Sequence, residues 1–544
     1  MKHLKYFVIL FIGLAISFQS YAQKSKAPKN WQHLNYADDG IYGVATDKAY
    51  EELLKGKQGE KVIVAVIDSG TDTNHDDLKG VLWSNNNEIA GNGIDDDGNG
   101  YIDDVNGWSF LGCEGIDVYE ETLELTRLYA MYSKEFEDKD IKNLSRKEKK
   151  EYKKYQEIKT AFEKERSKTQ KQYDRYKSKI SSLERNYKLI SSYLNKDDFK
   201  YTDLKSITSQ DSIIQYGKTK FERILQRDTA TSADIVVAKI NKKSEKYYNY
   251  LAEKLNYHLN YEWYPRAEKG YNESDFNNFI YGSNSYLAGG NSNGHGTHCA
   301  GIIAADRNND IGMNGVANNV EIMTIRAVPN GDEHDRDIAA AMRYAADNGA
   351  RIISMSYGKA YSYNKKVVDD AIEYAVNKGV LFVHAAGNDS KNIDIENNFP
   401  NVKNSGKSAK AWIEVGASSW KTGVSLPAVF SNYGKESVDI FAPGVDIYST
   451  VPSSDYDTYS GTSMAAPVVT GVAALVMSYY PNLSAKEVKK ILMKSVTELK
   501  DLRVKIPSNG KNGIAERGNF GELSKSGGIV NAYEALKLAE KKSK

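Results

Sequence analysis

The stretch KVIVAVIDSG, from Lys61 to Gly70, is an apolar run rich in β-branched residues that stops at an aspartate, a serine and a glycine. Such a run fits a strand that is buried on both faces, as in a parallel sheet. Similar segments recur downstream and alternate with segments of helical character. This alternation is typical of βαβ units, and it predicts an α/β fold with a central, mostly parallel sheet. The downstream strand segments are 320–328, 350–358, 379–388 and 412–418.

The composition limits the classes of function that the chain can have. It has 544 residues, enough for two or three domains, and 40% of them are hydrophobic, which suffices for a buried core. Its 73 basic and 72 acidic side chains nearly cancel. Without a basic excess there is no general attraction to nucleic acid, so we expect no nucleic-acid partner.

The first residues predict a secretory signal. MKHLK is basic, an apolar run follows from Tyr6 to Phe18, and a small-residue cleavage site ends at Ala22. We interpret residues 1–22 as a cleaved signal peptide; the alternative is an N-terminal anchor, for which the apolar run is short. No later segment is predicted to cross a bilayer. The protein is therefore expected to be secreted or periplasmic, with no stable membrane span.

One region interrupts the alternation of strands and helices. Between Ile116 and Tyr264 there is no proline and a single glycine, Gly217. Within it, apolar residues and tyrosines follow spacings of three and four, the pattern of a heptad seam on a long helix. We interpret the region as a helical hairpin or coiled-coil subdomain that packs on itself through a partly wet seam; the alternative is an arm that dimerises or docks a partner or substrate. The seam residues are Tyr173, Tyr176, Ile180, Leu183, Tyr187, Ile190 and Leu194.

Three polar residues stand in glycine-bearing motifs where α/β folds place functional groups. Asp68 ends the first predicted strand, and His295 lies between glycines at the start of a small apolar helix. Ser463 opens another such helix, where unpaired N–H groups and the positive dipole end favour developing negative charge. Each residue alone has a simpler interpretation: a turn aspartate, a structural histidine or half of a metal pair with His298, and an N-cap serine.

Taken together, DSGTD (68–72), HGTHCAG (295–301) and GTSMAAP (461–467) resemble the three signatures of the subtilisin-like (S8) serine proteases, whose triad follows the order Asp, His, Ser. The resemblance covers residues 40–110 and 285–540, and it implies a subtilisin-like, three-layer α/β/α fold. It also implies an endopeptidase that acts on proteins or peptides. Ser463 would attack the peptide carbonyl, His295 would transfer the proton, and Asp68 would orient the imidazole.

Further segments resemble the substrate site of the same family. HAAGND (384–389) looks like the oxyanion-hole segment, which implies that the Asn388 amide and the Ser463 N–H meet the oxyanion. SMSYG (354–358) looks like the strand that pairs with the substrate main chain. The residues implied to wall the substrate pocket are Ser356, Tyr357, Gly358, Ala386 and Gly387.

The two cysteines, Cys113 and Cys299, are too few for a disulfide scaffold in a chain of this length. Either they form one disulfide or Cys299 is a buried free thiol, and the sequence leaves both alternatives open. Because Cys299 directly follows HGTH, it resembles the thiol of the proteinase K-like branch of the family.

An acidic stretch, DDDGNGYIDDVN (95–106), resembles an EF-hand calcium loop, with Gly100 at the turn position and Asn106 in place of the terminal glutamate. We predict a structural Ca²⁺ ion here; the alternative is a hydrogen-bonded turn of Asp and Asn residues. Asp77 also matches a calcium-ligand aspartate of the protease family. The ligands predicted in the acidic stretch are Asp95, Asp97, Asn99 and Asp103.

Two departures from the family pattern shape the expected domain organisation. The helical region separates Asp68 from His295 far more than is usual, so we expect an insertion, residues 116–275, near the active-site rim, where it restricts or recruits substrates. Residues 23–115 and 276–544 would form the catalytic domain. The stretch between Ala22 and the first strand is too short for the usual propeptide, which implies a different activation route or folding without one.

Two other function classes compete with the protease. A binding protein on an inactive protease fold would use the helical region, but the complete set of Asp68, His295, Ser463 and Asn388 favours an enzyme. An esterase of the α/β-hydrolase type is disfavoured, because GTSMA lacks the G-x-S-x-G elbow and the aspartate precedes the other two residues.

Overall fold

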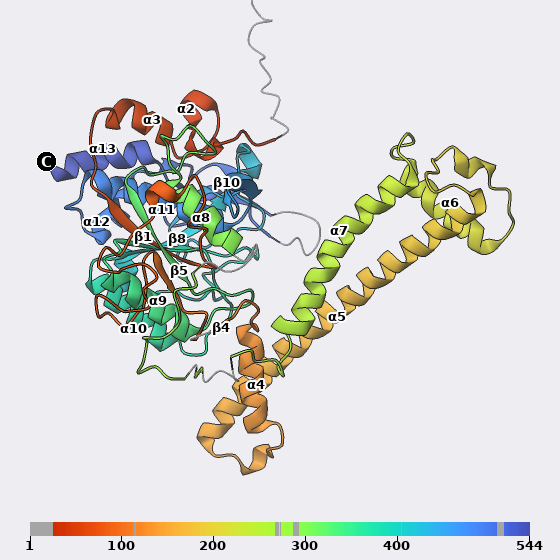
Figure 1. Ribbon diagram of the computed structural model, residues 1–544, viewed down its shortest axis with the longest axis horizontal. Helices are drawn as coiled ribbons and strands as arrows, with labels where there is room; N and C mark the ends of the chain where they lie inside the picture. The colour runs from red at the N-terminus through yellow and green to blue at the C-terminus, as the bar shows by residue number, and fades with distance from the viewer. Residues whose placement is uncertain are drawn as a thin grey trace, which may run out of the picture.

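The computed structural model describes residues 26–113, 116–266, 271–272, 274–286, 293–403, 405–508 and 516–544. Within them a nine-stranded sheet forms the centre of the fold (Figure 1). All neighbouring strands in it are parallel except the first pair. The strand order is β12 (Thr497–Glu498), β15 (Gly528–Ile529), β9 (Ile440–Pro443), β8 (Trp412–Ser418), β7 (Leu381–Ala385), β6 (Ile352–Met355), β1 (Val62–Asp68), β5 (Val320–Arg326) and β2 (Gly107–Ser109).

Helices cover both faces of the sheet, which explains why β1 is apolar throughout. Val64 and Val66 belong to the core on one face, whereas Ala65 and Ile67 belong to the core on the other. The predicted three-layer α/β/α fold is confirmed. The first core includes α8 (Gly294–Ala304), α11 (Thr462–Tyr479), α12 (Ala485–Lys494) and α13 (Ala532–Ser543), and the second includes α9 (Asp335–Asp347) and α10 (Lys365–Asn377).

Smaller elements surround this core. The short helices α2 (Tyr36–Asp39) and α3 (Thr46–Ala49) precede β1. Three two-stranded antiparallel pairs lie outside the main sheet among the described residues. They are β3 (Gly112–Cys113) with β4 (Ile116–Asp117), β10 (Ile447–Val451) with β11 (Asp455–Tyr459), and β13 (Arg503–Lys505) with β14 (Arg517–Asn519).

A long helical arm projects from the α/β body (Figure 1). It consists of α4 (Glu124–Phe136), α5 (Arg146–Leu194), α6 (Ser212–Leu225) and α7 (Ala233–Glu253), and a π-helical turn, η6 (Lys254–His258), ends it. Figure 1 shows α5 and α7 running side by side, with α6 at the far end. The arm thus leaves the body and returns to it within one segment of chain.

Local signals in the sequence set the limits of α5 and its contacts. The helix begins at a capping box between Ser145 and Glu148 and ends at Asn195, which takes a left-handed conformation with φ of 50°. In the seam, the rings of Tyr173 and Tyr248 stack at 4.8 Å, and their hydroxyls are 2.7 Å apart in a hydrogen bond. These hydroxyls make the seam partly polar, as the tyrosine spacing indicates.

Helix α11 is both long and apolar. By length and composition alone it could cross a membrane, and it is the one such helix in the described part of the chain. However, 89% of this apolar stretch is buried inside the fold. In this structure α11 packs as a core helix between the sheet and α13.

Candidate active site

Asp68 lies at the carboxyl end of β1, where the order of the strands reverses. The chain places β5 on one side of β1 and then crosses to place β6 on the other side. The loops on either side of such a reversal diverge and leave a crevice outside the carboxyl ends of the strands. A cavity of about 380 Å³ opens there, lined by Asp68, Ser69, Tyr119, His295, Arg326, Val328, Pro329, Asn330 and Ser356.

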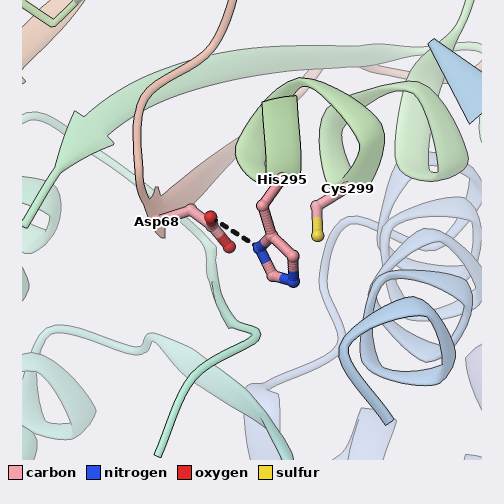
Figure 2. Close-up of side chains that lie close together, drawn as sticks. All are labelled: Asp68, His295 and Cys299. Atoms are coloured by element: carbon pink, nitrogen blue, oxygen red, sulfur yellow. Dashed lines mark hydrogen bonds and ion pairs between the residues drawn. The ribbon is translucent and has the colours of Figure 1, made fainter. Parts of the chain in front are cut away.

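His295 contacts Asp68 directly. His295 is the second residue of α8, and its Nδ1 lies 2.7 Å from Asp68 Oδ1 in a hydrogen bond (Figure 2). Asp68 is 1% exposed and also accepts from the Ser69 N–H at 2.7 Å, so its carboxylate is held in place. The His295 side chain keeps 39% of its surface exposed and faces the cavity. The imidazole is therefore oriented by a buried carboxylate and accessible to a substrate.

Electrostatics at this pair favour a protonated imidazole. Burial alone would lower the pKa of His295, but the charge of Asp68 and its hydrogen bond outweigh that effect. The net result is a pKa raised above the ordinary 6.5. A histidine of this kind can take up a proton during a reaction and release it afterwards.

Ser463 is the second residue of α11, at the same edge of the sheet. Its Oγ donates a hydrogen bond to the Ser356 carbonyl at 3.0 Å, and its own carbonyl accepts from Ser356 Oγ at 2.9 Å. The sequence indicated that Ser463 opens the helix but gave no sign of this bond. Catalytic hydrogen bonds are often unformed without substrate, and rotation about the Ser463 Cα–Cβ bond redirects Oγ.

Cys299 links the Asp68–His295 pair to Ser463. It lies on the same helix as His295 and points to the same side (Figure 2). Its Sγ, an Asp68 oxygen and a His295 nitrogen are all within 4.8 Å of one another, and Sγ donates to the Ser463 carbonyl at 3.4 Å. Ser463 and the Asp68–His295 pair thus share Cys299 as a neighbour. Cys299 is a buried free thiol, the second of the two alternatives for the cysteines, and burial raises its pKa well above the ordinary value.

Asn388 is oriented by the residue that precedes the serine. Its Oδ1 accepts hydrogen bonds from the Thr462 N–H at 2.8 Å and from the Thr462 hydroxyl at 3.0 Å. Because Oδ1 is held in this way, the amide Nδ2 is presented on the other side of the group. Thr462 is a positioning residue that the sequence motifs did not single out.

The predicted pocket walls lie at the carboxyl ends of β6 and β7. Tyr357 is buried, and its carbonyl is hydrogen-bonded to His384 Nε2 at 2.8 Å. Gly387 has φ of 99°, and a Cβ there would lie 2.5 Å from Asn432 Nδ2, so only glycine fits. Of the five predicted wall residues, Ser356 lines the cavity with the Asp68–His295 pair, and Gly387 donates its N–H to Thr462 Oγ1 at 3.1 Å. The others are Tyr357, Gly358 and Ala386, which adjoin these two in the chain.

His298 does not join His295 in a metal pair. Its ring stacks on Tyr459 at 4.3 Å, and its Nε2 contacts the carbonyls of Ile447 and Asp457. Burial, followed by the charge of His295, lowers the pKa of His298 to about 3. The residue is a neutral structural histidine that anchors the β10–β11 hairpin to α8.

The acidic stretch folds into a compact loop whose carboxylates meet differently from the EF-hand alignment. Ligand atoms of Asp95 and Asp97 lie within 4.8 Å of each other and of Glu88, a residue that the alignment missed. Asn99 stays close, since its N–H donates to Asp95 and its side chain to Asp97. Asp103 has turned away: its two oxygens accept from the N–H groups of residues 91, 92 and 93 at 2.7–3.2 Å.

Asp77 lies apart from that loop. It is fully buried, and its carboxylate accepts from Asn309 Nδ2 at 2.8 Å, the Met313 N–H at 3.1 Å and the Tyr456 hydroxyl at 3.2 Å. All three groups are donors as placed, although an amide such as that of Asn309 can present its oxygen after a half-turn. The structure thus separates Asp77 from the other four predicted metal ligands.

Comparisons with known proteins agree with these features. A family model described as the subtilase family matches residues 59–513. Among curated proteins, the chain is 44% identical over 188 residues to a thermophilic serine proteinase of Bacillus sp. (strain AK1), which covers 34% of this chain and 43% of that protein. It is 42% identical over 189 residues to thermitase of Thermoactinomyces vulgaris, covering 35% and 62%.

A third relative is subtilisin DY of Bacillus licheniformis, 37% identical over 230 residues, which covers 41% of this chain and 78% of that protein. The chain spans about half the length of the first two relatives. In each case the aligned part is less than half of this chain.

Proposed function

Because the chain belongs to the subtilase family, we propose that it is a serine endopeptidase that hydrolyses peptide bonds in proteins. The observation that carries this proposal is the 2.7 Å hydrogen bond between His295 Nδ1 and Asp68 Oδ1, in a cavity that Ser356, the hydrogen-bond partner of Ser463, also lines. A carboxylate, an imidazole and a hydroxyl at one edge of a sheet are the groups that acyl transfer through a triad requires.

The proposed reaction proceeds in two acyl-transfer steps. Ser463 Oγ rotates from the Ser356 carbonyl towards His295 Nε2 and attacks the peptide carbonyl, while Nε2 takes the hydroxyl proton. The tetrahedral oxyanion is met by Asn388 Nδ2 and the Ser463 N–H. His295 then gives the proton to the leaving amine. A water molecule, deprotonated by His295, hydrolyses the acyl-enzyme and restores Ser463.

Substrate would bind along the end of β6 as an added strand. Ser356, Tyr357 and Gly358 would offer main-chain groups to it, and Ala386 and Gly387 would face the side chain before the cleaved bond. Recognition of the main chain tolerates many sequences, so we expect protein substrates without a narrow motif. Tyr119 lines the same cavity just before the helical arm begins, which supports a role of the arm's base in contacting substrates.

A fluorophosphonate probe tests the proposal directly. The probe phosphonylates only a serine that its own site has activated, so we expect one stoichiometric adduct, which peptide mass mapping assigns to Ser463. Denatured protein serves as the control and should not react. A binding protein on an inactive protease fold would give no adduct in the folded state, and that result would exclude the peptidase.

Replacing Asn388 by alanine is expected to lower kcat by about 10²–10³-fold with little change in KM, the effect of removing one oxyanion donor. The loss falls on kcat because the donor acts on charge that appears only in the transition state. Asn377→Ala, at the end of α10, controls for the loss of an asparagine side chain away from the cavity. A change confined to KM would assign Asn388 to substrate binding instead.

We propose that the acidic loop holds a structural Ca²⁺ ion with Asp95, Asp97 and Asn99, and with Glu88 in place of Asp103. The clustered oxygen donors of Glu88, Asp95 and Asp97 suit a hard cation. Asp103 would instead stabilise the loop by accepting hydrogen bonds from the N–H groups of residues 91, 92 and 93. Asp77, with the Asn309 amide beside it, is a second candidate calcium ligand.

Calcium is expected to raise the melting temperature of the chelator-treated chain. Free Ca²⁺ at 100 times its Kd would stabilise the folded state by about 2.7 kcal/mol, enough for a visible shift in thermal unfolding. Asp95→Asn should remove most of that shift. Asp47→Asn, on the exposed face of α3, provides the matched control. Equal shifts in the two variants would show that calcium acts elsewhere.

We further propose a secreted or periplasmic location. The predicted signal peptide, residues 1–22, lies outside the described residues, and support comes from relatives such as a cell wall-associated protease of Bacillus subtilis, 36% identical over 223 residues. The proposed domain division keeps residues 116–275 as an insertion between two parts of one catalytic domain.

A further inference from the structure

A second cluster of metal-binding side chains lies where the helical arm returns to the body. Glu120 follows β4, Glu253 is the last residue of α7, and His258 is the last residue of η6. One ligand atom from each lies within 4.8 Å of the other two, and His258 Nε2 is 3.9 Å from Glu120 Oε2. Segments more than a hundred positions apart in the chain thus place two carboxylates and one imidazole around a common point.

His258 is buried with an unused ring nitrogen directed at this point. The residue is 7% exposed, and among the described residues its Nε2 has no hydrogen-bond partner. The main chain fixes its position, because the His258 carbonyl accepts from the Leu123 N–H at 3.0 Å and from Thr126 Oγ1 at 2.7 Å. A buried polar atom without a partner is costly and rare, and a bound cation would account for it.

The two glutamates share one neutral partner. Asn330 Nδ2 donates to Glu120 Oε2 at 2.9 Å and to Glu253 Oε1, so one neutral amide serves both carboxylates. Within the described residues no lysine or arginine pairs with either glutamate, and the neighbouring Lys254 is paired with Glu165 at 2.8 Å.

We propose that Glu120, Glu253 and His258 bind a divalent transition-metal ion of the Zn²⁺ type. Imidazole nitrogen with carboxylate oxygen is a donor set for zinc and its neighbours, whereas Ca²⁺ takes six to eight oxygens. Tetrahedral ligands at about 2.0–2.1 Å from zinc are roughly 3.3 Å apart, so the donors need only a small inward shift. Water would complete the coordination.

This ion would fasten the returning end of the arm to a wall of the catalytic cavity. The Asn330 N–H donates to the Tyr119 carbonyl at 2.8 Å, and the Glu121 N–H donates to the Asn330 carbonyl at 2.9 Å. Tyr119 and Asn330 both line the cavity that contains Asp68 and His295. The metal would therefore fix Tyr119 and Asn330 in the cavity where a peptide substrate would bind.

Cobalt binding tests the proposal on the full chain. Ser463→Ala is used to prevent self-digestion, excess Ca²⁺ keeps the acidic loop saturated, and Co²⁺ reports coordination through its visible absorption. We expect about one equivalent of Co²⁺ with the intense bands of a four-coordinate nitrogen and oxygen site, displaced by Zn²⁺. No such bands would overturn the proposal, and a sulfur-to-cobalt charge-transfer band would place the ion at Cys299 instead.

Substitutions then locate the ion. Glu253→Gln keeps the shape of the side chain but removes its charge. We expect no cobalt bands from this variant or from His258→Gln. Glu88→Gln, in the acidic loop, should still give the bands. Bands that persist in both arm variants would refute the assignment. If circular dichroism shows that a variant is misfolded, X-ray absorption of the zinc-loaded parent chain identifies the ligands. Scattering from imidazole and oxygen would support the proposed site, and scattering from sulfur would contradict it. These measurements require no catalytic turnover, so they stand apart from the peptidase proposal.

Discussion

Replacing Ser463 by alanine is expected to lower kcat for peptide hydrolysis by about 10⁶-fold, the scale found when the nucleophile of such a triad is removed. The fold should survive, because the substitution removes one hydrogen bond, from Ser463 Oγ to the Ser356 carbonyl. The main-chain carbonyl of residue 463 would keep its contacts with Ser356 Oγ and Cys299 Sγ. Catalysis and stability should therefore separate almost completely in this variant.

The measurement compares initial rates on a denatured protein substrate with thermal unfolding of the same preparations. Ser478→Ala, at the other end of α11, is the matched control, because Ser478 is also buried and its hydroxyl accepts one hydrogen bond, from Asn319 Nδ2 at 3.2 Å. It should retain activity while losing some stability. Wild-type turnover by the Ser463 variant would eliminate the serine mechanism, whatever happened to the melting temperature.

The sheet and the helix starts that carry His295 and Ser463 could be predicted because their signals are local. A buried parallel strand needs a continuous apolar run, and the run that ends at Asp68 forms β1. The glycines that flank His295, and Gly461 two residues before Ser463, indicated helix starts, and both residues are second in their helices. The order of the strands is a long-range property, so the sequence offered no way to see that β1 lies between β5 and β6.

The acidic loop shows where pattern matching fails. An EF-hand places its ligands by the two helices that flank it, and the described structure has no such helices beside residues 95–106. The loop instead closes on the preceding turn, where Glu88 accepts from the N–H groups of Asp97 and Asp103. Asp103 takes a left-handed conformation, φ 56°, and its carboxylate turns to residues 91–93. Spacing within the motif carries no information about that earlier turn.

The sequence also did not reveal which residues the arm contacts. The heptad spacing predicted a seam, and Tyr173 meets Tyr248 there, but the partner helix could not be assigned from spacing alone. Glu120, Glu253 and His258 carry no motif at all. They meet because the arm returns to its own base, and only the three-dimensional structure brings Asn330 from the body into the same cluster.

Asp68→Asn is expected to lower kcat/KM by about 10⁴-fold and to change its pH dependence. An asparagine cannot stabilise the imidazolium by charge, and its amide favours the wrong imidazole tautomer. In the native protein Asp68 raises the pKa of His295 above 6.5 against the effect of burial, and the reaction needs the imidazole neutral. The acid limb of the native kcat/KM profile should therefore lie above pH 6.5 and move to lower pH in the variant.

The Asp68–His295 pair also links the stability of the fold to pH. Folding raises the pKa of this histidine, so its protonation stabilises the folded state. The stabilisation is complete at pH values below the pKa of the histidine in the unfolded chain. It is lost as the pH rises through the pKa in the folded chain. In the Ser463→Ala background, Asp68→Asn should therefore cost more unfolding free energy at about pH 5 than at about pH 9. In the chain that retains Ser463, Asp72→Asn replaces one of the two oxygens that accept from the Asn74 and Ser453 N–H groups, and it should leave the acid limb of the kcat/KM profile in place. An acid limb that stays in place in the Asp68 variant would mean that another group, and not His295, is the base.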